Sequence, residues 1–457
     1  MGKMSLIIVV GFNIFFMLMG LNLSSIASHS YNNYTNYYAV EQAQFLAESA
    51  ANVSIGSLYQ NQSWLYGDSA VHNHTMEGGT YSIQAKRSYP NGGAYVTFNI
   101  VSTFNGMVDS STVVCNIPAF STYAMYTCND GGNPWSTNDT CFGKLHVDND
   151  LTISGNPYFG GAVTVGGSLQ GSGTPTYKAG NPTLGVKLGW VDNFDAVKNI
   201  AGYDSIDVGK KTTWKDSKGK TQIYQSDVYV QLMADGTIQI DTGKHISNDS
   251  SSLRTTWAAI SAKSTHMQSF TVNSMTTKVL GIMGDTSQAN LHIRGTLSGQ
   301  VTIANLGFGN VYIDSSIIYN NKSTDLLGLV AKDTISVTDD PANNTGFVNI
   351  QAAVLASTFV VQNQENDTTA TMRNANTKGY GKGSQGYLNL FGSLAQKNRG
   401  YVGKNVSGTM YGLLKHYTYD NRFSGNGSAP SFPTLPYFQI LSWYDRMSWS
   451  RSWWDVW

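Results

Sequence analysis

The sequence has few charged residues and few cysteines. Only 13% of its 457 residues are Asp, Glu, Lys or Arg, against about 25% in a typical soluble domain, and its 29 basic residues equal its 29 acidic ones. A chain without net positive charge lacks the electrostatic footprint of a nucleic-acid-binding protein. Glycine, tyrosine and uncharged polar residues take the place of charge, while 41% hydrophobic residues suffice for a core. This composition favours a β-rich exported protein over a cytosolic enzyme and predicts no nucleic-acid partner.

An uncharged, mostly apolar run follows Lys3. Residues 4–28 contain no acidic or basic side chain, and about 20 apolar residues are enough to cross a bilayer as a helix. A cleavable signal peptide, cut near Ala27, is the alternative. Because helical sequence continues well beyond Ala27, the run favours a membrane-spanning helix. Lys3 then places the N-terminus in the cytoplasm and exports the remainder to the cell envelope or surface.

The helical pattern continues as far as Gly56 without a proline. We therefore predict one helix over residues 1–60, half in the membrane and half outside it. Small and β-branched residues recur on one face of its outer half. Small side chains let helices approach closely, so this face, together with Glu48, is predicted to be the assembly interface. It comprises Val40, Ala43, Ala47, Glu48, Ala50 and Val53. The protein's own head is the alternative neighbour of the alanine stripe.

The segment Ala43-Gln-Phe-Leu-Ala-Glu-Ser-Ala resembles a segment of type IV minor pilins and pseudopilins. In those proteins an apolar helix is followed by a sequence like Ala-Phe-Xaa-Ala-Ala-Glu-Ala-Gly, and Glu48 takes the place of its acidic residue. The match covers residues 1–60. It departs from the major pilins at the N-terminus, where Gly2 would end a leader but Ile7 stands in place of their Glu. The resemblance implies a surface protein that assembles with other pilin-like subunits or with itself. An ordinary signal anchor with a helical stalk is the alternative.

Alternating strands follow the helix. Residues 77–115 have period-two patterning broken by the turn signals Pro90-Asn-Gly-Gly and Phe104-Asn-Gly-Met, which are typical of hairpins. We predict a three-stranded antiparallel meander within a domain spanning residues 61–142. The order of helix, Gly-Gly-Thr-Tyr and meander resembles the head of a small pilin.

Three cysteines, Cys115, Cys128 and Cys141, surround a loop rich in Asn and Gly. In an exported chain this spacing allows a disulfide and leaves one thiol over. Cys128–Cys141 would close the loop, and Cys115–Cys128 is the alternative. Only His146 lies near them in sequence, which is too few ligands for structural zinc. We predict no metal and no cofactor.

Short apolar triplets dominate the chain from Gly143 onward. Leu291-His-Ile, Val301-Thr-Ile and Val311-Tyr-Ile begin at ten-residue intervals, and turn residues separate them. This pattern predicts a parallel β-solenoid over residues 143–436, with an irregular insert at 181–275. An antiparallel sandwich is the alternative. The stretch 275–445 also resembles an uncharacterised bacterial family in which a pilin-type helix carries a β-solenoid-like surface domain.

The final segment, residues 437–457, is rich in aromatic residues. Its first part, Tyr437–Tyr444, is predicted to cap the open end of the solenoid, as solenoids require. Its second part is predicted to bind a surface glycan or a neighbouring subunit. That part contains Trp449, Trp453, Trp454 and Trp457.

The predicted fold class is therefore mostly β with a long N-terminal helix, and the predicted function is structural. The acidic turn Asp148-Asn-Asp lacks EF-hand spacing, and no carboxylate cluster recurs at rung spacing in residues 291–361, as a glycosidase would require. We predict a non-enzymatic subunit or accessory component of a type IV pilus-like filament or secretion apparatus, exposing its solenoid for adhesion. One alternative is a membrane-anchored β-solenoid enzyme or binding protein acting on polysaccharide. Another is an envelope protein without a filament.

Overall fold

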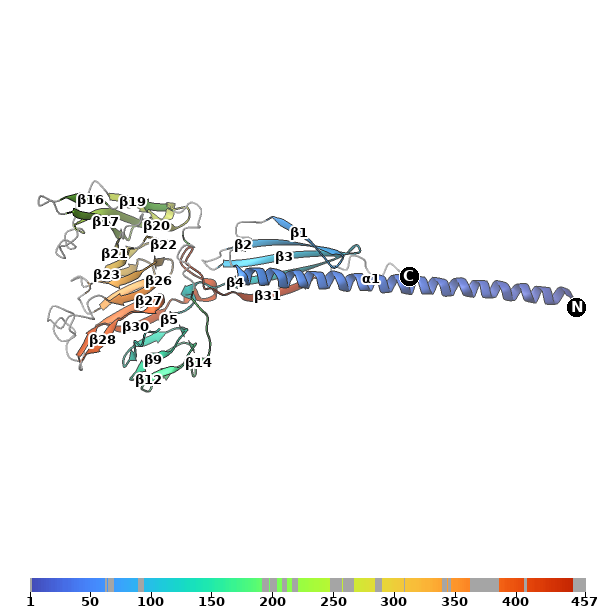
Figure 1. Ribbon diagram of the computed structural model, residues 1–457, viewed down its shortest axis with the longest axis horizontal. Helices are drawn as coiled ribbons and strands as arrows, with labels where there is room; N and C mark the ends of the chain where they lie inside the picture. Colours follow the sequence, from blue (N-terminus) through green and yellow to red (C-terminus); the bar gives the residue numbers. More distant parts are fainter. Residues whose placement is uncertain are drawn as a thin grey trace. The chain divides into compact units, whose positions relative to one another are not determined.

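The computed structural model describes most of the 457-residue chain. The described residues are 2–61, 64, 70–88, 94–190, 197, 204–207, 212–215, 221–246, 257, 267–283, 290–307, 309–338, 343, 347–361, 386–406 and 409–446. They divide into two compact units (Figure 1). The first contains the chain up to Ser88, then Tyr95–Asn116, and then the chain from Gln439 onward. The second contains Tyr89–Ala94 and Ile117–Phe438.

The first unit begins with one helix, α1 (Gly2–Gln60), of 59 residues. From Gly2 to Tyr38 its side chains are almost all exposed. Beyond Tyr38 the helix buries one stripe whose members recur every three or four residues, as expected for a helix with one covered face. The stripe contains Ala39, Ala43, Leu46, Ala47, Ala50, Ala51, Ser54 and Leu58. The prediction of a long N-terminal helix followed by mostly β structure is confirmed.

An antiparallel sheet covers this stripe. Its strands lie in the order β1 (Val71–Met76), β2 (Gly79–Ser88), β3 (Ala94–Phe104), β4 (Met107–Ile117) and β31 (Gln439–Arg446). The turn between β3 and β4 is Asn105-Gly106, with φ of 46° and 80°. Positive φ at both residues is typical of the type I′ turn that the Asn-Gly signal predicts. The other predicted turn, at Pro90, lies outside the described residues.

The helix packs closely on the sheet, as Figure 1 shows. The Ser102 hydroxyl on β3 donates a hydrogen bond to the Ala43 carbonyl at 2.6 Å. A Cβ added at Gly79 on β2 would lie 2.3 Å from Leu46 Cδ1, so only glycine lets this strand approach the helix. Buried Phe98 and Ile100 of β3 fill the space between the two layers.

The second unit consists mainly of short strands. They are β5 (Met125–Asn129), β6 (Trp135–Ser136), β7 (Thr140–Phe142), β8 (Leu145–Val147), β9 (Leu151–Ser154), β10 (Tyr158–Phe159), β11 (Val163–Val165), β12 (Leu169–Ser172), β13 (Thr176–Tyr177), β14 (Thr183–Leu184), β15 (Asp204–Asp207), β16 (Thr212–Lys215), β17 (Thr221–Leu232), β18 (Thr237–Ile246), β19 (Met267–Thr271), β20 (Val279–Met283), β21 (Leu291–Leu297), β22 (Gln300–Asn305), β23 (Val311–Tyr319), β24 (Leu326–Ala331), β25 (Thr334–Val337), β26 (Phe347–Val361), β27 (Tyr387–Arg399), β28 (Gly403–Val406), β29 (Thr409–Gly412) and β30 (Leu414–Tyr419). Short 3-10 turns lie at Phe120–Thr122 (η1), Val272–Ser274 (η4) and Asn421–Asn426 (η6).

Most of these strands pair in parallel and in register. One column of apolar residues runs through eight strands, each residue opposite the next, and buries a continuous core. Its members, in order, are Leu280, Ile303, Leu329, Val354, Leu394, Met125, Leu145 and Val163.

The stacking order differs from the order of the sequence. Strand β27 pairs in parallel with β26 on one side and with β5 on the other, so residues 125–165 stack on the last long strands of the body. The predicted boundary at residue 143 is therefore wrong, because the strands from Met125 onward, including the predicted cysteine loop, belong to the body. The irregular insert contributes β17, β18 and β19, which pair antiparallel.

Two irregular segments, residues 117–124 and 420–437, cover the outer face of one strand column. We call them the strap. The Phe120 amide donates to the Pro433 carbonyl at 3.1 Å, and the Leu435 amide donates to the Pro118 carbonyl at 2.8 Å. A Cβ at Gly328 would lie 3.0 Å from side-chain atoms of both Ala429 and Phe432 in the strap.

The predicted cap over Tyr437–Tyr444 is wrong. Gln439–Arg446 forms β31, which pairs antiparallel with β4 in the first unit. Ile440, Leu441 and Tyr444 are exposed, so they do not cover an end of the body. The alternating pattern of this segment suits an edge strand, and its partner lies more than three hundred residues earlier in the chain.

Candidate functional sites

The N-terminal part of α1 presents an apolar surface. Its most apolar 18-residue window has a mean hydropathy of 2.3, and none of that window is buried. The helix is therefore long and apolar enough to cross a membrane. Its exposed large side chains include Leu6, Ile7, Ile8, Val9, Val10, Phe12, Ile14, Phe15, Phe16, Met17, Leu18, Met19, Leu21, Leu23 and Ile26.

The structure divides the predicted assembly interface. Ala43, Ala47 and Ala50 are at most 1% exposed because the protein's own sheet covers them. For these three residues the prediction of contact with a neighbouring subunit is wrong: small side chains let the sheet, rather than a second helix, approach. Val40 and Glu48 are half-buried and Val53 is exposed.

The opposite face of the same helical segment is open. Phe45 and Val53 are 53% and 45% exposed, Tyr59 is 77% exposed, and Glu41 and Asn52 are also exposed. Of these residues the sequence prediction included only Val53. Phe45 and Tyr59 could have been found from the helical spacing, because they lie off the alanine stripe.

Overpacking the buried stripe should destabilise the first unit. In the variant Ala47→Leu, the added methyl groups meet the sheet, and we expect a loss of about 1–3 kcal/mol. Hydrogen exchange of β3 and β4 amides should accelerate in proportion. The matched control is Val53→Leu on the open face, which should leave exchange unchanged. Unchanged exchange in Ala47→Leu would contradict the packing described above.

Asp109 on β4 is a buried acidic residue beside this helix. It is 4% exposed, and among the described residues neither carboxylate oxygen accepts a well-formed hydrogen bond, although the Ser110 N–H lies close enough to interact weakly. Burial raises the pKa of Asp109, and nearby Asp445 and Glu48 raise it further, while the Ser110 N–H offsets only part of the rise. The folded state therefore favours the protonated acid.

Asp109→Asn should stabilise the first unit at neutral pH. Because the folded pKa is raised, the wild type is most stable below the ordinary pKa of 3.8 and loses stability as pH rises through the folded value. We expect a gain of about 1 kcal/mol for the variant at pH 7, which vanishes at low pH. Chemical denaturation across pH measures it. Asp445→Asn, on an exposed residue, is the control, and an equal gain there would contradict the role of burial.

The three cysteines, all described by the structure, form no disulfide. Cys141 lies in the inner core with Met125. Cys128 follows the alternation of β5 and shares the face of Tyr126, which belongs to the outer cluster under the strap. Cys115 lies on β4, in the other unit. The predicted Cys128–Cys141 bridge is therefore wrong because the two side chains point to opposite faces.

The four predicted interaction tryptophans are Trp449, Trp453, Trp454 and Trp457, and they lie outside the described residues. Within the described part of the chain, no group of three or more His, Cys, Asp and Glu side chains could hold a metal ion.

A polar cavity of about 620 Å³ opens on the body. Side chains of several chemical types surround it, together with backbone at three glycines. Its lining is Asn129, Gly131, Gly132, Asp148, Asn149, Asp150, Thr152, Gly167, Gln170 and Lys187.

Asp148 at this cavity is held by a dense set of hydrogen bonds. Its Oδ1 accepts from the Leu188 and Gly189 amides at 2.7 and 3.1 Å and lies 2.8 Å from His146 Nε2. Burial by itself raises the pKa of Asp148, but the bonds from His146 and the two amides outweigh it and lower the pKa. Asp148 is therefore an ionised anchor for the cavity wall.

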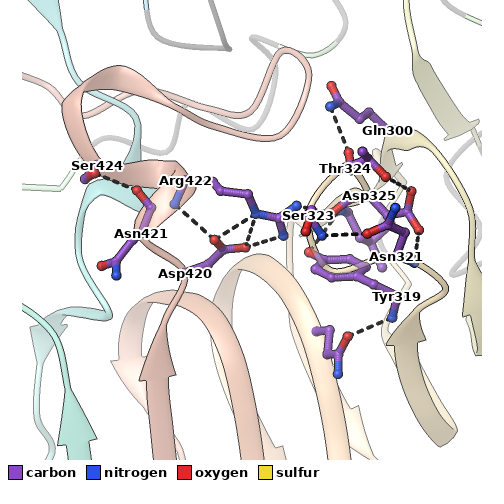
Figure 2. A network of polar contacts seen from close by, with 12 residues as sticks. Gln300, Tyr319, Asn321, Ser323, Thr324, Asp325, Asp420, Asn421, Arg422 and Ser424 are labelled. Carbon is purple, nitrogen blue, oxygen red and sulfur yellow. Dashed lines mark hydrogen bonds and ion pairs between the residues drawn. The ribbon is translucent and has the colours of Figure 1, made fainter.

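A second polar network attaches the strap to the strand column (Figure 2). Arg422 pairs with Asp420, and its Nη1 donates to the Asp325 carbonyl at 2.9 Å. The Asp325 carboxylate accepts from the Gly299 and Asn321 amides at 2.9 and 2.6 Å. This network joins residues about a hundred positions apart in the chain.

Two buried ion pairs flank Trp135. Arg399 Nη1 lies 2.5 Å from Asp130 Oδ1, and Lys415 Nζ lies 2.7 Å from Asp139 Oδ2. The Arg399 guanidinium carbon and Lys415 Nζ lie 4.8 and 5.5 Å from the centre of the indole ring. All four charged side chains are at most 5% exposed. The sequence does not reveal this cluster, because its members lie up to 285 positions apart.

Comparison with solved structures finds similarity to a pilin. The crystal structure of the competence-associated pilin ComZ from Thermus thermophilus aligns over 90% of this chain and 98% of that chain, with 11% identity and a TM-score of 0.29. A TM-score of this size does not establish a shared fold. No protein-family model matches the sequence, and no curated protein matches it.

Proposed function

We propose that the chain is a pilin-like structural protein of the cell surface, anchored in the membrane by the first half of α1. One observation carries this proposal. Before Ala39, α1 is apolar and almost all of its side chains are exposed; from Ala39 onward, one face of the same helix is buried against a sheet. A bare apolar helix is stable in lipid and costly in water. The second half of the helix is integrated with an antiparallel sheet and so belongs outside the membrane.

The proposed role is that of a subunit or accessory component of a type IV pilus-like filament or secretion apparatus. Its partners would be copies of itself or other pilin-like subunits. The open helix face with Phe45, Val53 and Tyr59 and the apolar N-terminal half are the surfaces left for them. ComZ is itself a pilin, but its structural similarity to this chain is too low to support the proposal.

The body is proposed to be a parallel β-solenoid that presents a surface for adhesion. In-register parallel pairing and the unbroken apolar column support this reading. The role is proposed to be structural rather than enzymatic, without a cofactor. The strap and its Arg422 network would stabilise the stacked strands of the body against mechanical force.

Disulfide crosslinking on intact cells tests the assembly. A cysteine at Phe45 or at Val53 should crosslink to a neighbouring subunit and give dimers on a non-reducing gel. A cysteine at Ala47 is the matched control, because the protein's own sheet covers that position. Dimers from Ala47→Cys but not from the open face, or no dimers from any position, would contradict the proposal.

A second candidate function is binding of, or action on, polysaccharide at the cavity beside Asp148. Its amide, carboxylate and ammonium groups (Asn149, Asp150, Gln170 and Lys187) are the kinds of group that hydrogen-bond sugar hydroxyls. Glycan-array binding by the full chain, lost in Gln170→Ala and retained in Thr80→Ala on the first unit, would support it. No glycan bound by the wild type would remove it.

A further inference from the structure

Lys415 and Asp139 are positioned for a chemical reaction as well as for an ion pair. We propose that Lys415 Nζ and the Asp139 carboxyl carbon are joined by an amide bond, a side-chain crosslink that forms within the folded body. The two residues are 276 positions apart in the chain. They lie on neighbouring elements, because β7 and β30 pair in parallel with His416 opposite Thr140.

The structure holds the two groups in fixed contact. Asp139 Oδ1 accepts from the Lys415 amide at 2.9 Å, and Oδ2 accepts from the Ser136 amide at 2.8 Å and from Lys415 Nζ at 2.7 Å. Both carboxylate oxygens are thus oriented by backbone. Groups that are preorganised at contact distance gain a large kinetic advantage over the same groups in solution.

The surroundings of Lys415 destabilise its charged form. The Lys415 and Asp139 side chains are 5% and 0% exposed, and Trp135, Cys141 and Tyr417 are buried around them. Burial lowers the pKa of Lys415, and Arg399 lowers it further, against the opposing effects of Asp139 and Asp130. A neutral lysine amine is a nucleophile, and a buried lysine is the usual way to obtain one.

The reaction balances without any further reagent. A proton moves from the Lys415 ammonium to the Asp139 carboxylate, which gives an amine and a carboxylic acid. The nitrogen then bonds to the carboxyl carbon, the carbon–hydroxyl bond breaks, and the departing hydroxyl takes a proton from nitrogen and leaves as water. No oxidation or reduction occurs.

The bond would close a covalent ring through the body. It would tie β7 to β30 at the point where the early strands stack on the late ones. This junction pairs segments from opposite ends of the body's sequence. An amide bond there would connect β7 and β30 covalently, in addition to the hydrogen bonds between the two strands.

Peptide mapping of the full-length protein, purified in detergent, tests the proposal. Trypsin should fail to cleave after Lys415, and the peptide 405–422 should be recovered bonded to the peptide 88–144, lighter by one water than their sum. Cleavage after Lys397 and Lys404 should be normal. The Lys415→Arg variant, which trypsin also cleaves after position 415, should give the peptides 405–415 and 416–422 and an unmodified 88–144 peptide. Complete cleavage after Lys415 in the wild type, with an unmodified 88–144 peptide, would overturn the proposal whatever the variant does.

Discussion

The double variant Phe15→Asp/Phe16→Asp should leave the membrane fraction. Each aspartate at the centre of a spanning helix costs about 2.5–3.5 kcal/mol on the insertion scale, so the pair costs about 5–7 kcal/mol. Both phenylalanines are exposed, at 60% and 62%, and do not support the fold of either unit. Fractionation of cells followed by immunoblotting measures the change.

The control for this experiment is an aspartate on the same helix beyond the apolar run. Tyr59→Asp, on the open face, should stay in the membrane fraction because its side chain lies outside the lipid. A wild-type protein that is already soluble, with an N-terminus near Ala27, would show that residues 4–28 are a cleaved signal and would contradict the anchor.

The second large effect is expected at the buried ion pair of the body. Arg399→Met leaves Asp130 buried without its cation and also removes the guanidinium from the Trp135 ring. Removing one partner of a buried pair costs about 3–5 kcal/mol. The midpoint of thermal unfolding of the body should fall accordingly, as measured by calorimetry.

The double variant Asp130→Leu/Arg399→Met distinguishes the effect of an unpaired buried carboxylate from the effect of lost packing. Replacing both partners by apolar residues of similar volume is often close to neutral, so this variant should recover most of the lost stability. If the double variant were as unstable as Arg399→Met, the loss would come from packing rather than from the unpaired carboxylate.

The helix could be predicted from the sequence because its signals are local. An uncharged run and a stripe of small residues lie within sixty consecutive positions. The occupant of the stripe could not be predicted, because small residues permit close approach by a sheet as readily as by a helix. Ser102 and Gly79, which complete that contact, carry no signal that links them to Ala43 or Leu46.

In the body, the individual strands could be predicted but their stacking could not. Triplets such as Leu291-His-Ile form strands as expected. Leu394 pairs with Met125 across distant parts of the chain. Because the apolar triplets resemble one another, the sequence does not show which triplet pairs with which. The same limit applies to β31, whose aromatic residues predicted a cap although they form an edge strand of the first unit.

The buried polar clusters had no counterpart in the sequence analysis. Asp139 lies in a turn-rich stretch where aspartate is an ordinary turn residue, and Lys415 lies between Leu414 and His416. Only the fold brings them to 2.7 Å. A lysine directly after Leu413 and Leu414 was the available signal, since an unpaired lysine is almost never buried.

Immunogold electron microscopy of intact cells, with a tag inserted in the body, tests the central claim most directly. The account predicts label on the cell surface or along filaments, and loss of that label in Phe15→Asp/Phe16→Asp. Label that appears only in the cytoplasm of sectioned cells, with none on intact cells, would contradict a membrane-anchored, pilin-like surface protein.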